Sequence, residues 1–594
     1  MTNYFGFPFF RPKHLLPGML AGLVLGVSIV QADSHCEPWT VQAGESVSKL
    51  AGAHLGDVNR YMEIVEATNK AAAEGGNFSA LTDPNRIEIG MTLCIPGHKE
   101  AYSEDGQQQN QAQNRASDGI VEFIILQVND VYEISPVAGG KEGGLARLAT
   151  LKKQLLDENP NTYLFLAGDL FSPSALGTAK VDGVRLDGKH IVDVMNHVGL
   201  EYSTIGNHEF DIAEEAFFAR IEESNSVWTS ANVVDNNGQP FPGITQHSEF
   251  TVQDHDGDQL IVGVVGGMLK NFVSKYSTFE EPLPAIKAEV AKMTDSSDFI
   301  VALTHLTMAE DMELAVQVPD IDVIMGGHER ENIQALRGSP GTLITKADAN
   351  ARTAYIHRIK YDLEQDSFEH SATLRRIDDS LEDDPEVEKV VKKWEDIAFQ
   401  GFKQQGFEPD DLVTTTTDNL DGREASVRNH ETNLSKLIGD GMLHMSDAAS
   451  ISISNSGSIR IDDIIPAGNI SQYDVIRVLP FGGEVVLVKM AGSMLKQTLD
   501  QGEANVGSGG YLVRSGVTKD ETQGWLADGA AIDDAGFYQV AISEFLLTGK
   551  EKGLGFLKPT EDNKDQLEII DPALGDIRNA LIDELLTVYG APNQ

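Results

Sequence analysis

Polar side chains suited to metal binding follow several apolar, strand-like runs between residues 120 and 330. Each run stops at an Asp, Asn or His, and these residue types offer carboxylate, amide or imidazole ligands. Carboxylates and imidazoles can also move protons or stabilise developing charge. The residues, with the runs that lead to them, are Asp130 (FIILQVND), Asp169 (TYLFLAGD), Asn207 and His208 (YSTIGNHEFD), His305 (FIVALTH) and His328 (IDVIMGGH).

A single polar residue at a strand end is usually a helix cap or a satisfied polar group. Several in one domain favour a shared site, because ligand sites in layered α/β proteins gather at the carboxyl ends of strands. The ligand types favour zinc, manganese or iron, and a chain with two cysteines cannot supply an all-thiolate zinc site. Glycines at 168, 206, 326 and 327 would let the backbone turn sharply beside the ligands.

The words GDLFSPS, GNHEFD, THL and GGHE together resemble the calcineurin-like metallophosphoesterases. Most of residues 120–594 resembles their exported 5′-nucleotidase and UDP-sugar hydrolase family. The resemblance implies an α/β fold in which a layered β-sandwich domain, flanked by helices, carries a site for divalent metals. The metal ligands that it implies are Asp169 as a bridge, Asn207, His305 and His328 on one metal, and Asp130 on the other.

The same resemblance implies a catalytic role for two residues of the GNHEFD word. His208 would lie near the phosphoryl group and stabilise charge, while Asp211 would fix its tautomer and orientation. The alternative is that His208 is an ordinary structural histidine.

Two positions depart from the family's pattern. The family has Asp-x-His in its first motif and a further ligand two residues after the GGH histidine, whereas this chain has Tyr132 and Arg330. Arg330 has only hydrogen-bond donors, and Tyr132 could ligate only after a large fall in its pKa. We therefore expect one secure metal, zinc, manganese or similar, and a doubtful second site. Arg330 would act as a catalytic clamp that supplies charge to the phosphate.

The C-terminal half carries candidate substrate-binding residues. Arginines near predicted turns could grip a phosphate, although each one alone is more often a surface ion pair. The resemblance implies that such arginines bind phosphate, and that two aromatic rings enclose a nucleoside base. A Phe followed by two leucines is otherwise usually core. The set is Arg423, Arg428, Asn455, Arg460, Phe481, Phe545 and Glu551, the last standing where the family often has Asp.

The N-terminus resembles a secretory signal peptide over residues 1–32. Arg11 and Lys13 precede the apolar run LLPGMLAGLVLGVSIV, and Ala32 offers a cleavage point. We expect export to a periplasm or cell envelope and no stable membrane span after cleavage, although an uncleaved anchor is the alternative. Cys36 and Cys94 could then form a disulfide, and the alternative is two buried free thiols.

Residues 33–97 read as a small strand, helix, helix, strand domain of α+β type. The words TVQAGESVSKLA and DPNRIEIGMTLCIP resemble the LysM module, which implies binding of peptidoglycan or another N-acetylglucosamine polymer. A spacer domain is the alternative. Residues 98–119 hold few large apolar side chains, so they read as a flexible linker.

The remaining boundaries come from changes of composition. We expect a catalytic metallophosphoesterase domain at 120–378, a linker helix at 379–410 and an α/β 5′-nucleotidase C-terminal domain at 411–594. The net charge of −45 becomes −47 without residues 1–32, which hold two basic residues and no acidic one. Such a charge disfavours nucleic acid and anionic membranes as partners.

These features predict an exported, wall-tethered, metal-dependent phosphohydrolase that removes phosphate from nucleotides. One alternative is a nucleotide diphosphate-sugar hydrolase or a cyclic-nucleotide phosphodiesterase, because the same residues could attack those bonds. Another is a non-catalytic nucleotide binder of the cell wall with a degenerate metal site, which Tyr132 and Arg330 would favour.

Overall fold

A computed structural model of the chain describes residues 36–41, 47, 49–51, 60–73, 78–81, 87, 91–96, 117–270, 274–339 and 341–591. The predicted signal peptide and residues 98–116 of the predicted linker lie outside these ranges. The chain forms two compact units. One comprises Met1–Ile134, Gly143–Phe171 and Ile191–Val390, and the other comprises Ser135–Glu142, Ser172–His190 and Val391–Gln594.

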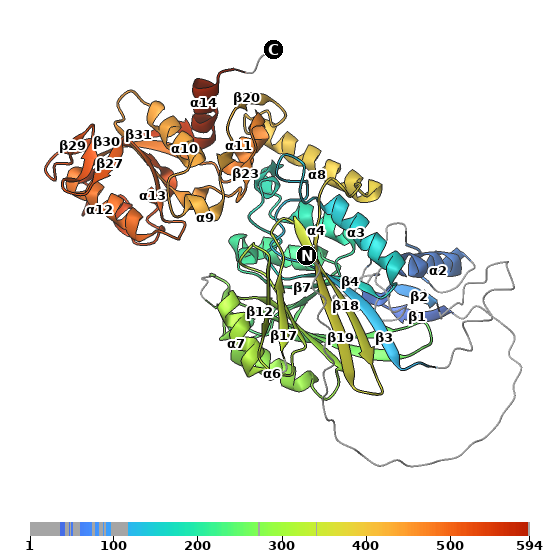
Figure 1. The fold of residues 1–594 in the computed structure, drawn as a ribbon. Helices are drawn as coiled ribbons and strands as arrows, with labels where there is room; N and C mark the ends of the chain where they lie inside the picture. Colours follow the sequence, from blue (N-terminus) through green and yellow to red (C-terminus); the bar gives the residue numbers. More distant parts are fainter. Residues whose placement is uncertain are drawn as a thin grey trace, which may run out of the picture. The chain divides into compact units, whose positions relative to one another are not determined.

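The first unit is built around two β-sheets (Figure 1). Their strands are β3 (Ile120–Val128), β4 (Thr162–Leu166), β7 (Tyr202–Thr204), β8 (Val227–Thr229), β10 (Ile244–Thr245), β11 (His247–Gln253), β12 (Gln259–Met268), β14 (Phe299–His305), β15 (Val323–Gly326), β16 (Ile333–Arg337), β17 (Thr342–Lys346), β18 (Thr353–Asp362) and β19 (Ser367–Arg376). The 7-stranded sheet has the order β10-β8-β7-β4-β3-β18-β19, and the 6-stranded sheet has the order β11-β12-β14-β15-β17-β16. A short antiparallel pair joins β9 (Val233–Asp235) to β13 (Ser277–Phe279).

The two sheets pack face to face, and helices cover them. Alternate residues of β3, such as Phe123 and Ile125, pack in one core with Val262 and Val264 of β12, because successive side chains of a strand point to opposite faces. The other face of the 6-stranded sheet packs against α6 (Pro282–Met293) and α7 (Met308–Gln317). Other helices of this unit include α3 (Leu145–Glu158), which contacts β4, then α4 (Lys189–Val198) and α5 (Glu214–Glu223). Burial on both faces explains the continuous apolar runs.

Parallel pairing brings the candidate ligands to one end of each sheet. Strands β3, β4 and β7 are neighbours in parallel, and so are β14 and β15. Each of these strands ends within three residues of a predicted ligand. Their carboxyl ends therefore meet at a common edge, as expected for a layered α/β domain.

The second unit is a layer of sheet between two layers of helix. Its elements are β5 (Lys180–Val181), β6 (Val184–Arg185), β20 (Leu412–Thr416), β21 (Leu420–Asp421), α9 (Glu424–Val427), α10 (Asn433–His444), β22 (Ile451–Asn455), β23 (Ile464–Ile465), β24 (Gly468–Ser471), α11 (Gln472–Val478), β25 (Glu484–Ala491), α12 (Gly492–Ala504), β26 (Leu512–Ser515), β27 (Val517–Asp520), β28 (Gly524–Ala527), β29 (Ala530–Ala531), β30 (Phe537–Ser543), α13 (Glu544–Leu547), β31 (Leu567–Asp576) and α14 (Ile577–Tyr589). The central sheet has the order β26-β22-β30-β25-β31. Helices α10 and α14 bury apolar residues against one face, and α12 and α13 do so against the other.

The described N-terminal residues form a small layered segment. Strand β1 (Cys36–Thr40) pairs antiparallel with β2 (Thr92–Pro96), and α2 (Tyr61–Ala73) packs on them through Ile64 and Val65. Residues 47 and 49–51 are helical. The arrangement agrees with the predicted strand, helix, helix, strand order, and the identity of this segment as a LysM module stays a prediction.

The mixed α/β class is confirmed, with sheets covered by helices in both units. The boundary between the two units lies inside α8 (Pro385–Gln404), and two loops from the first half of the chain, 135–142 and 172–190, belong to the second unit. Within the described ranges, every helix is too short or too polar to cross a lipid bilayer.

Candidate metal centre

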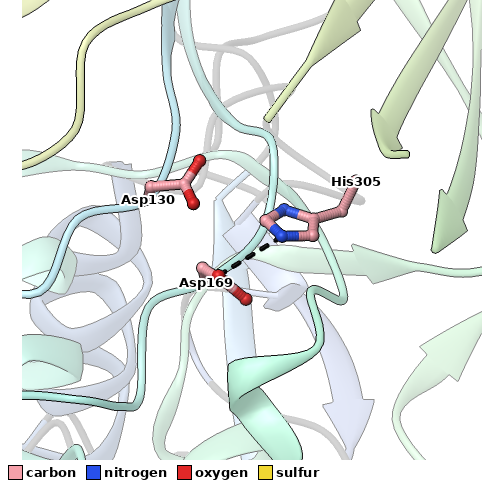
Figure 2. Close-up of side chains that lie close together, drawn as sticks. All are labelled: Asp130, Asp169 and His305. Carbon is pink, nitrogen blue, oxygen red and sulfur yellow. Dashed lines mark ion pairs between the residues drawn. The ribbon is translucent and has the colours of Figure 1, made fainter. Parts of the chain in front are cut away.

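Two carboxylates and an imidazole converge at the carboxyl ends of β3, β4 and β14. Ligand atoms of Asp130, Asp169 and His305 lie within 4.8 Å of one another, and all three residues are buried. Figure 2 shows the side chains turned toward a common point, with an ion pair of 3.3 Å between His305 Nε2 and Asp169 Oδ2. Of the predicted ligands, these three are brought together most closely.

Backbone strain is concentrated at this point. Asp130, Asp169, His328 and Arg330 all adopt positive φ, at 51°, 62°, 85° and 62°. Residues other than glycine rarely occupy this region, and such strain persists where a functional arrangement requires it. The four side chains are therefore aimed by strained turns directly after the strands.

Two buried acceptors at the centre have no hydrogen-bond partner. The Nδ1–H of His305 donates to the Ala167 carbonyl at 2.8 Å, so Nε2 is the ring nitrogen that faces the centre, where it has an ion-pair partner in Asp169 Oδ2 at 3.3 Å but no hydrogen bond. The Oδ1 atom of Asn207 is also buried without a hydrogen-bond partner. Unsatisfied buried acceptors cost free energy unless a cation or a donor compensates them. The donor set therefore fits a divalent metal ion beside Asp169.

His328 lies on the same side as His305. Their ring centroids are 5.4 Å apart and their planes are nearly perpendicular, at 72°. Burial, and then the charge of His305, lowers the pKa of His328, so its imidazole favours the neutral form that a metal requires. The structure thus places the His328 ring beside His305, and the predicted set of Asp169, Asn207, His305 and His328 on one ion stays a prediction.

The electrostatics favour a charged carboxylate at Asp169. Burial acts to raise its pKa, but chiefly the charge of His305, together with that of Arg330, outweighs burial and holds the pKa well below its usual range. For His305 burial acts to lower the pKa, yet Asp169 and Asp130 raise it to about 9. A positive charge is therefore favoured between these side chains.

Donors of the protein lie close to both oxygens of Asp130, as they do at Asp169, where Oδ1 accepts from the backbone N–H of His208 at 2.9 Å. Oδ2 of Asp130 accepts from Asn129 Nδ2 and from the backbone N–H of His328, each at 2.9 Å. Oδ1 lies 3.1 Å from the Tyr132 hydroxyl and 3.7 Å from Arg330 Nε. This carboxylate has less capacity for a metal ion than the orphaned acceptors.

Tyr132 and Arg330, the two residues that depart from the family's pattern, contact each other. Arg330 lies over the Tyr132 ring, 4.9 Å from its centroid, and the Tyr132 hydroxyl lies 2.8 Å from Asp169 Oδ2. Burial above all, opposed by Arg330, raises the pKa of Tyr132 well above its usual value. Tyr132 is therefore a neutral donor between Asp130 and Asp169, and a phenolate ligand is disfavoured.

His208 is held from both ring nitrogens. Nδ1 donates to Asp211 Oδ2 at 2.6 Å, and Arg330 Nη2 donates to Nε2 at 2.9 Å. This network assigns the neutral Nδ1–H tautomer. His208, Asp211 and Arg330 form one connected chain at the rim of the centre.

Glu209 was not identified from the sequence, although it lies within the GNHEFD word. Its buried carboxylate accepts backbone N–H groups of Asp169, Leu170, Phe171 and Gly206, at 2.5 to 3.1 Å. It ties the turn after β4 to the turn after β7. The contact joins turns about 40 residues apart. The local sequence therefore shows only an acidic residue close to a predicted ligand and does not predict its backbone partners.

The glycines serve close packing more than turning. Of the four glycines predicted to permit sharp turns, only Gly168 has a positive φ. At Gly327 an added Cβ would lie 2.3 Å from the Ala167 carbonyl and 2.9 Å from His305 Nδ1. Space beside the ligands is therefore the main requirement at Gly327.

Two of the three predicted phosphate-binding arginines of the second unit are engaged by neighbouring carboxylates. Arg423 precedes α9 and pairs with Asp421, with Nη2–Oδ2 at 2.8 Å, and Arg428 follows α9 and pairs with Glu424 at 2.5 Å. These ion pairs match the surface alternative for each arginine, and a role in phosphate binding stays a prediction.

The other predicted substrate residues group in pairs. Asn455 Nδ2 donates to Glu551 Oε2 at 3.1 Å, and the Arg460 guanidinium lies 5.5 Å from the centroid of the Phe481 ring. Phe481 and Phe545 are 42% and 40% exposed, so neither ring is core. Exposed aromatic faces of this kind suit stacking with a heterocycle.

Cys94 is disulfide-bonded and buried in β2. The side chain of Cys36 lies outside the described side chains, so the predicted pairing of Cys36 with Cys94 stays a prediction.

Comparison with known families gives two matches in this chain. Residues 123–331 match the family described as calcineurin-like phosphoesterase, and residues 413–558 match the 5′-nucleotidase C-terminal domain. The first match contains all five predicted metal ligands. The second contains all seven predicted substrate residues.

Relatives and solved structures agree with these matches. The chain is 27% identical to 5′-nucleotidase from Bos taurus over 67% of this chain and 75% of that protein. It is 24% identical to the trifunctional nucleotide phosphoesterase protein YfkN from Bacillus subtilis (strain 168), over 66% of this chain but only 28% of that protein. The crystal structure of a 5′-nucleotidase precursor from Thermus thermophilus shares the fold, with a TM-score of 0.63, 20% identity, and coverage of 80% of this chain and 99% of that one.

Orphaned ligands at the strand ends and the two family matches lead to the same assignment. The chain therefore combines a calcineurin-like metallophosphoesterase domain with the C-terminal domain of the 5′-nucleotidase family, and it is a metal-dependent phosphoric ester hydrolase.

Proposed function

We propose that this hydrolase removes phosphate from nucleotides. The observation that carries the proposal is the set of orphaned acceptors beside Asp169, combined with a match to the 5′-nucleotidase C-terminal domain. Relatives named 5′-nucleotidase from Bos taurus and Homo sapiens support the same substrate class.

Asp169, Asn207, His305 and His328 would hold one divalent ion. Carboxylate, amide and imidazole ligands suit zinc, manganese or a similar metal. An ion held there supplies Lewis-acid activation of water and of phosphoryl oxygens. Hydrogen bonds of the protein orient these ligands. His305 donates from Nδ1 to the Ala167 carbonyl, and Asp169 accepts the backbone N–H of His208 at 2.9 Å.

Asp130 would serve as a counter-ion more than as a ligand. An ion shared by Asp130 and Asp169 would compete for space with the Tyr132 hydroxyl, which lies between their carboxylates. The Arg330 guanidinium beside Asp130 already supplies positive charge and would repel a divalent cation. We therefore propose one firmly bound ion and a second position taken over by Tyr132 and Arg330.

Arg330 and His208 would contact the phosphoryl group. A guanidinium presents several donors in a fixed plane and can grip phosphate through two hydrogen bonds. The Arg330 Nη2 bond to His208, and that of His208 to Asp211, would orient both side chains before substrate arrives. Fixed charge from Arg330 would stabilise the transition state where a second ion is weak.

In the second unit, the exposed rings of Phe481 and Phe545 are proposed to bind the base. Arg423, Arg428 and Arg460 are proposed to bind phosphate, and Asn455 and Glu551 to contact the nucleoside. Phosphate would have to replace Asp421 as a partner of Arg423, because that pair is bidentate. Replacement is feasible because the pair is partly exposed and therefore weak.

We also propose export and attachment to the cell wall. The basic and apolar N-terminus supports export, and the resemblance to LysM supports binding of peptidoglycan through residues 33–97. A pull-down of the full chain with purified peptidoglycan is the test. Loss of binding on deletion of residues 33–97 is expected.

A substrate panel tests the function. AMP, UDP-glucose and 2′,3′-cyclic AMP are incubated with the protein and Mn²⁺, Zn²⁺ or Mg²⁺, and released phosphate is measured, after phosphatase treatment for the diester substrates. Faster turnover of AMP supports the nucleotidase. Faster turnover of UDP-glucose would instead favour a diphosphate-sugar hydrolase, and faster turnover of cyclic AMP would favour a cyclic phosphodiesterase.

Ion counting tests the single-ion site. Elemental analysis after gel filtration should give one Mn²⁺ per wild-type chain. A Tyr132→His, Arg330→His double variant, which restores two possible ligands, should bind a second ion. Arg337→His on the exposed edge strand β16 is the control and should leave the count at one. Two ions in the wild type would contradict the single-ion site.

A further inference from the structure

Lys346 is a fully buried cation behind the candidate metal centre. It is the last residue of β17 and has 0% of its surface exposed. Its Nζ lies 2.6 Å from the Leu306 carbonyl, 2.8 Å from the Gly327 carbonyl, 2.8 Å from Asp311 Oδ2 and 2.5 Å from Glu329 Oε2. A buried ammonium is tolerated only when its charge and its donors are satisfied in this way.

Three of the four acceptors belong to the chain segments that carry the two predicted ligand histidines. Leu306 directly follows His305, while Gly327 precedes His328 and Glu329 follows it. One ammonium therefore joins the end of β14 to the turn after β15. Moving either segment would break a charge-assisted hydrogen bond in a dry environment, where such bonds are strong.

The carboxylates around Lys346 are anchored in turn. Asp311 Oδ1 accepts from Thr304 Oγ1 at 2.7 Å, and Glu329 Oε1 accepts from the backbone N–H of Met308 at 2.5 Å. Thr304 precedes His305, and Met308 begins α7. The cluster thus connects β14, α7, the turn after β15 and β17.

The side chains around Lys346 are tightly packed. A Cβ added to Gly326 would lie 2.8 Å from Lys346 Cε and 2.9 Å from Asp311 Oδ2. Glu329, which Lys346 binds, is flanked by the two strained residues His328 and Arg330. Strained backbone conformations persist when surrounding contacts over-determine them, and Lys346 supplies such contacts.

We propose that Lys346 is a positioning residue that holds His305 and His328 in ion-binding geometry. It contacts neither substrate nor the ion and acts through Leu306, Gly327 and Glu329. Supporting groups of this kind typically change metal affinity by about 10- to 100-fold when they are removed. The proposal concerns ion binding and holds whichever phosphate ester is the substrate.

The test compares two buried lysines of the same unit. Lys152 is also buried, with 3% of its side chain exposed, and it pairs with Glu201 at 2.5 Å and donates to the Gly199 carbonyl. It lies on α3 and takes no part in the metal centre. Lys346→Met and Lys152→Met should both lower the Tm, because each strands a buried carboxylate. Only Lys346→Met should change the ion site.

Mn²⁺ titration of each purified full-length variant by calorimetry gives the affinity, without substrate. We expect binding about 10- to 100-fold weaker in Lys346→Met and within about twofold of wild type in Lys152→Met. The electron paramagnetic resonance spectrum of bound Mn²⁺ should change in Lys346→Met alone. Unchanged affinity and spectrum in folded Lys346→Met, or equal weakening in Lys152→Met, would overturn the proposal.

Glu329→Gln tests the positioning role of Lys346 if the Lys346→Met variant does not fold. The amide keeps the size of the side chain but loses the charge that binds Lys346. Weaker Mn²⁺ binding, by about threefold or more, supports the positioning role, since charged hydrogen bonds are stronger than neutral ones. Wild-type affinity in Glu329→Gln overturns it. Failure of AMP turnover in the wild type would affect only the proposed substrate, since these titrations contain none.

Discussion

Two acidic clusters of the first unit meet the same geometric condition for binding a cation. Ligand atoms lie within 4.8 Å of one another both in the buried set of Asp130, Asp169 and His305 and in a second, more exposed set formed by the β11–β12 turn and by Asp118, which precedes β3. The exposed set is Asp118, Asp254, Asp256 and Asp258. The clusters differ in burial and in what their oxygens already bind.

The exposed cluster is satisfied by its own backbone. Asp254 Oδ1 accepts the N–H groups of Asp256, Gly257 and Asp258 at 3.0 to 3.1 Å. Asp258 Oδ2 accepts from Gly119 N–H and Ser117 Oγ, each at 2.9 Å. Such bonds form the tight turn and fasten the start of β3, so the carboxylates have a structural role without a cation.

At the buried cluster, two side-chain atoms lack a hydrogen-bond partner in a water-poor environment, one in the cluster and one on the neighbouring Asn207. His305 Nε2 and Asn207 Oδ1 have no hydrogen-bond partner there. The difference teaches that a high density of carboxylates is a weak sign of a metal site. Orphaned, buried and converging acceptors are a stronger sign, because the protein has no other way to offset their desolvation.

The largest predicted effect is at the centre of the buried cluster. Asp169→Asn removes the negative charge that faces His305 while keeping the side chain's size. We expect kcat to fall by at least about 10³-fold and the bound ion to be lost, because the carboxylate is the one anionic ligand of the proposed set. Turnover of AMP and elemental analysis measure both effects. Retention of the ion with full activity would remove the distinction between the two clusters.

Arg330→Met should have the next largest effect. The guanidinium contributes fixed charge at the rim, and loss of one such donor costs about 10²- to 10³-fold in kcat. The ion count should stay at one, because Arg330 is not a ligand. Arg337→Met on the exposed edge strand is the matched control and should retain activity. Equal activity in both variants would show that fixed charge at the rim is unimportant.

Glu209→Gln tests how the backbone supports the buried cluster. The Glu209 carboxylate accepts four backbone N–H groups, whereas the amide of Gln would face some of them with donors of its own. We expect stability to fall by about 2 to 4 kcal/mol, as for other buried polar groups left unpaired. Denaturant unfolding measures the loss. An unchanged midpoint would mean that the turns after β4 and β7 hold without this carboxylate.

Sequence pattern predicts the strand ends well because each one is a local signal. An apolar run followed directly by Asp130, Asp169 or His305 indicates both the strand and the residue at its end, and the parallel order of strands brings the ends together. Tyr132 and Arg330 were noticed as exceptions for the same reason. Their mutual contact was not predictable, because nearly 200 residues separate them.

Residues that hold the site in place from a distance have no comparable local sequence pattern. Lys346 contacts Leu306 across 40 residues, and its burial cannot be read from a strand that ends in Thr and Lys. A surface ion pair was the stated alternative for Arg423, but its partner Asp421 was not predicted, because several acids compete for each arginine in so acidic a chain. Long-range packing and local competition between charges are therefore what the sequence alone leaves open.

The smallest predicted effect concerns the exposed cluster. Asp256→Asn keeps the shape of the β11–β12 turn and removes one of four carboxylates from a solvated surface, where neighbouring charges are screened. We expect the Mn²⁺ count to stay at one and kcat/KM for AMP to stay within about twofold of wild type. The same two assays as for Asp169→Asn make the comparison direct. A lower ion count in Asp256→Asn would mean that solvated carboxylates with backbone partners also retain a cation, and burial would lose its value as the distinguishing sign.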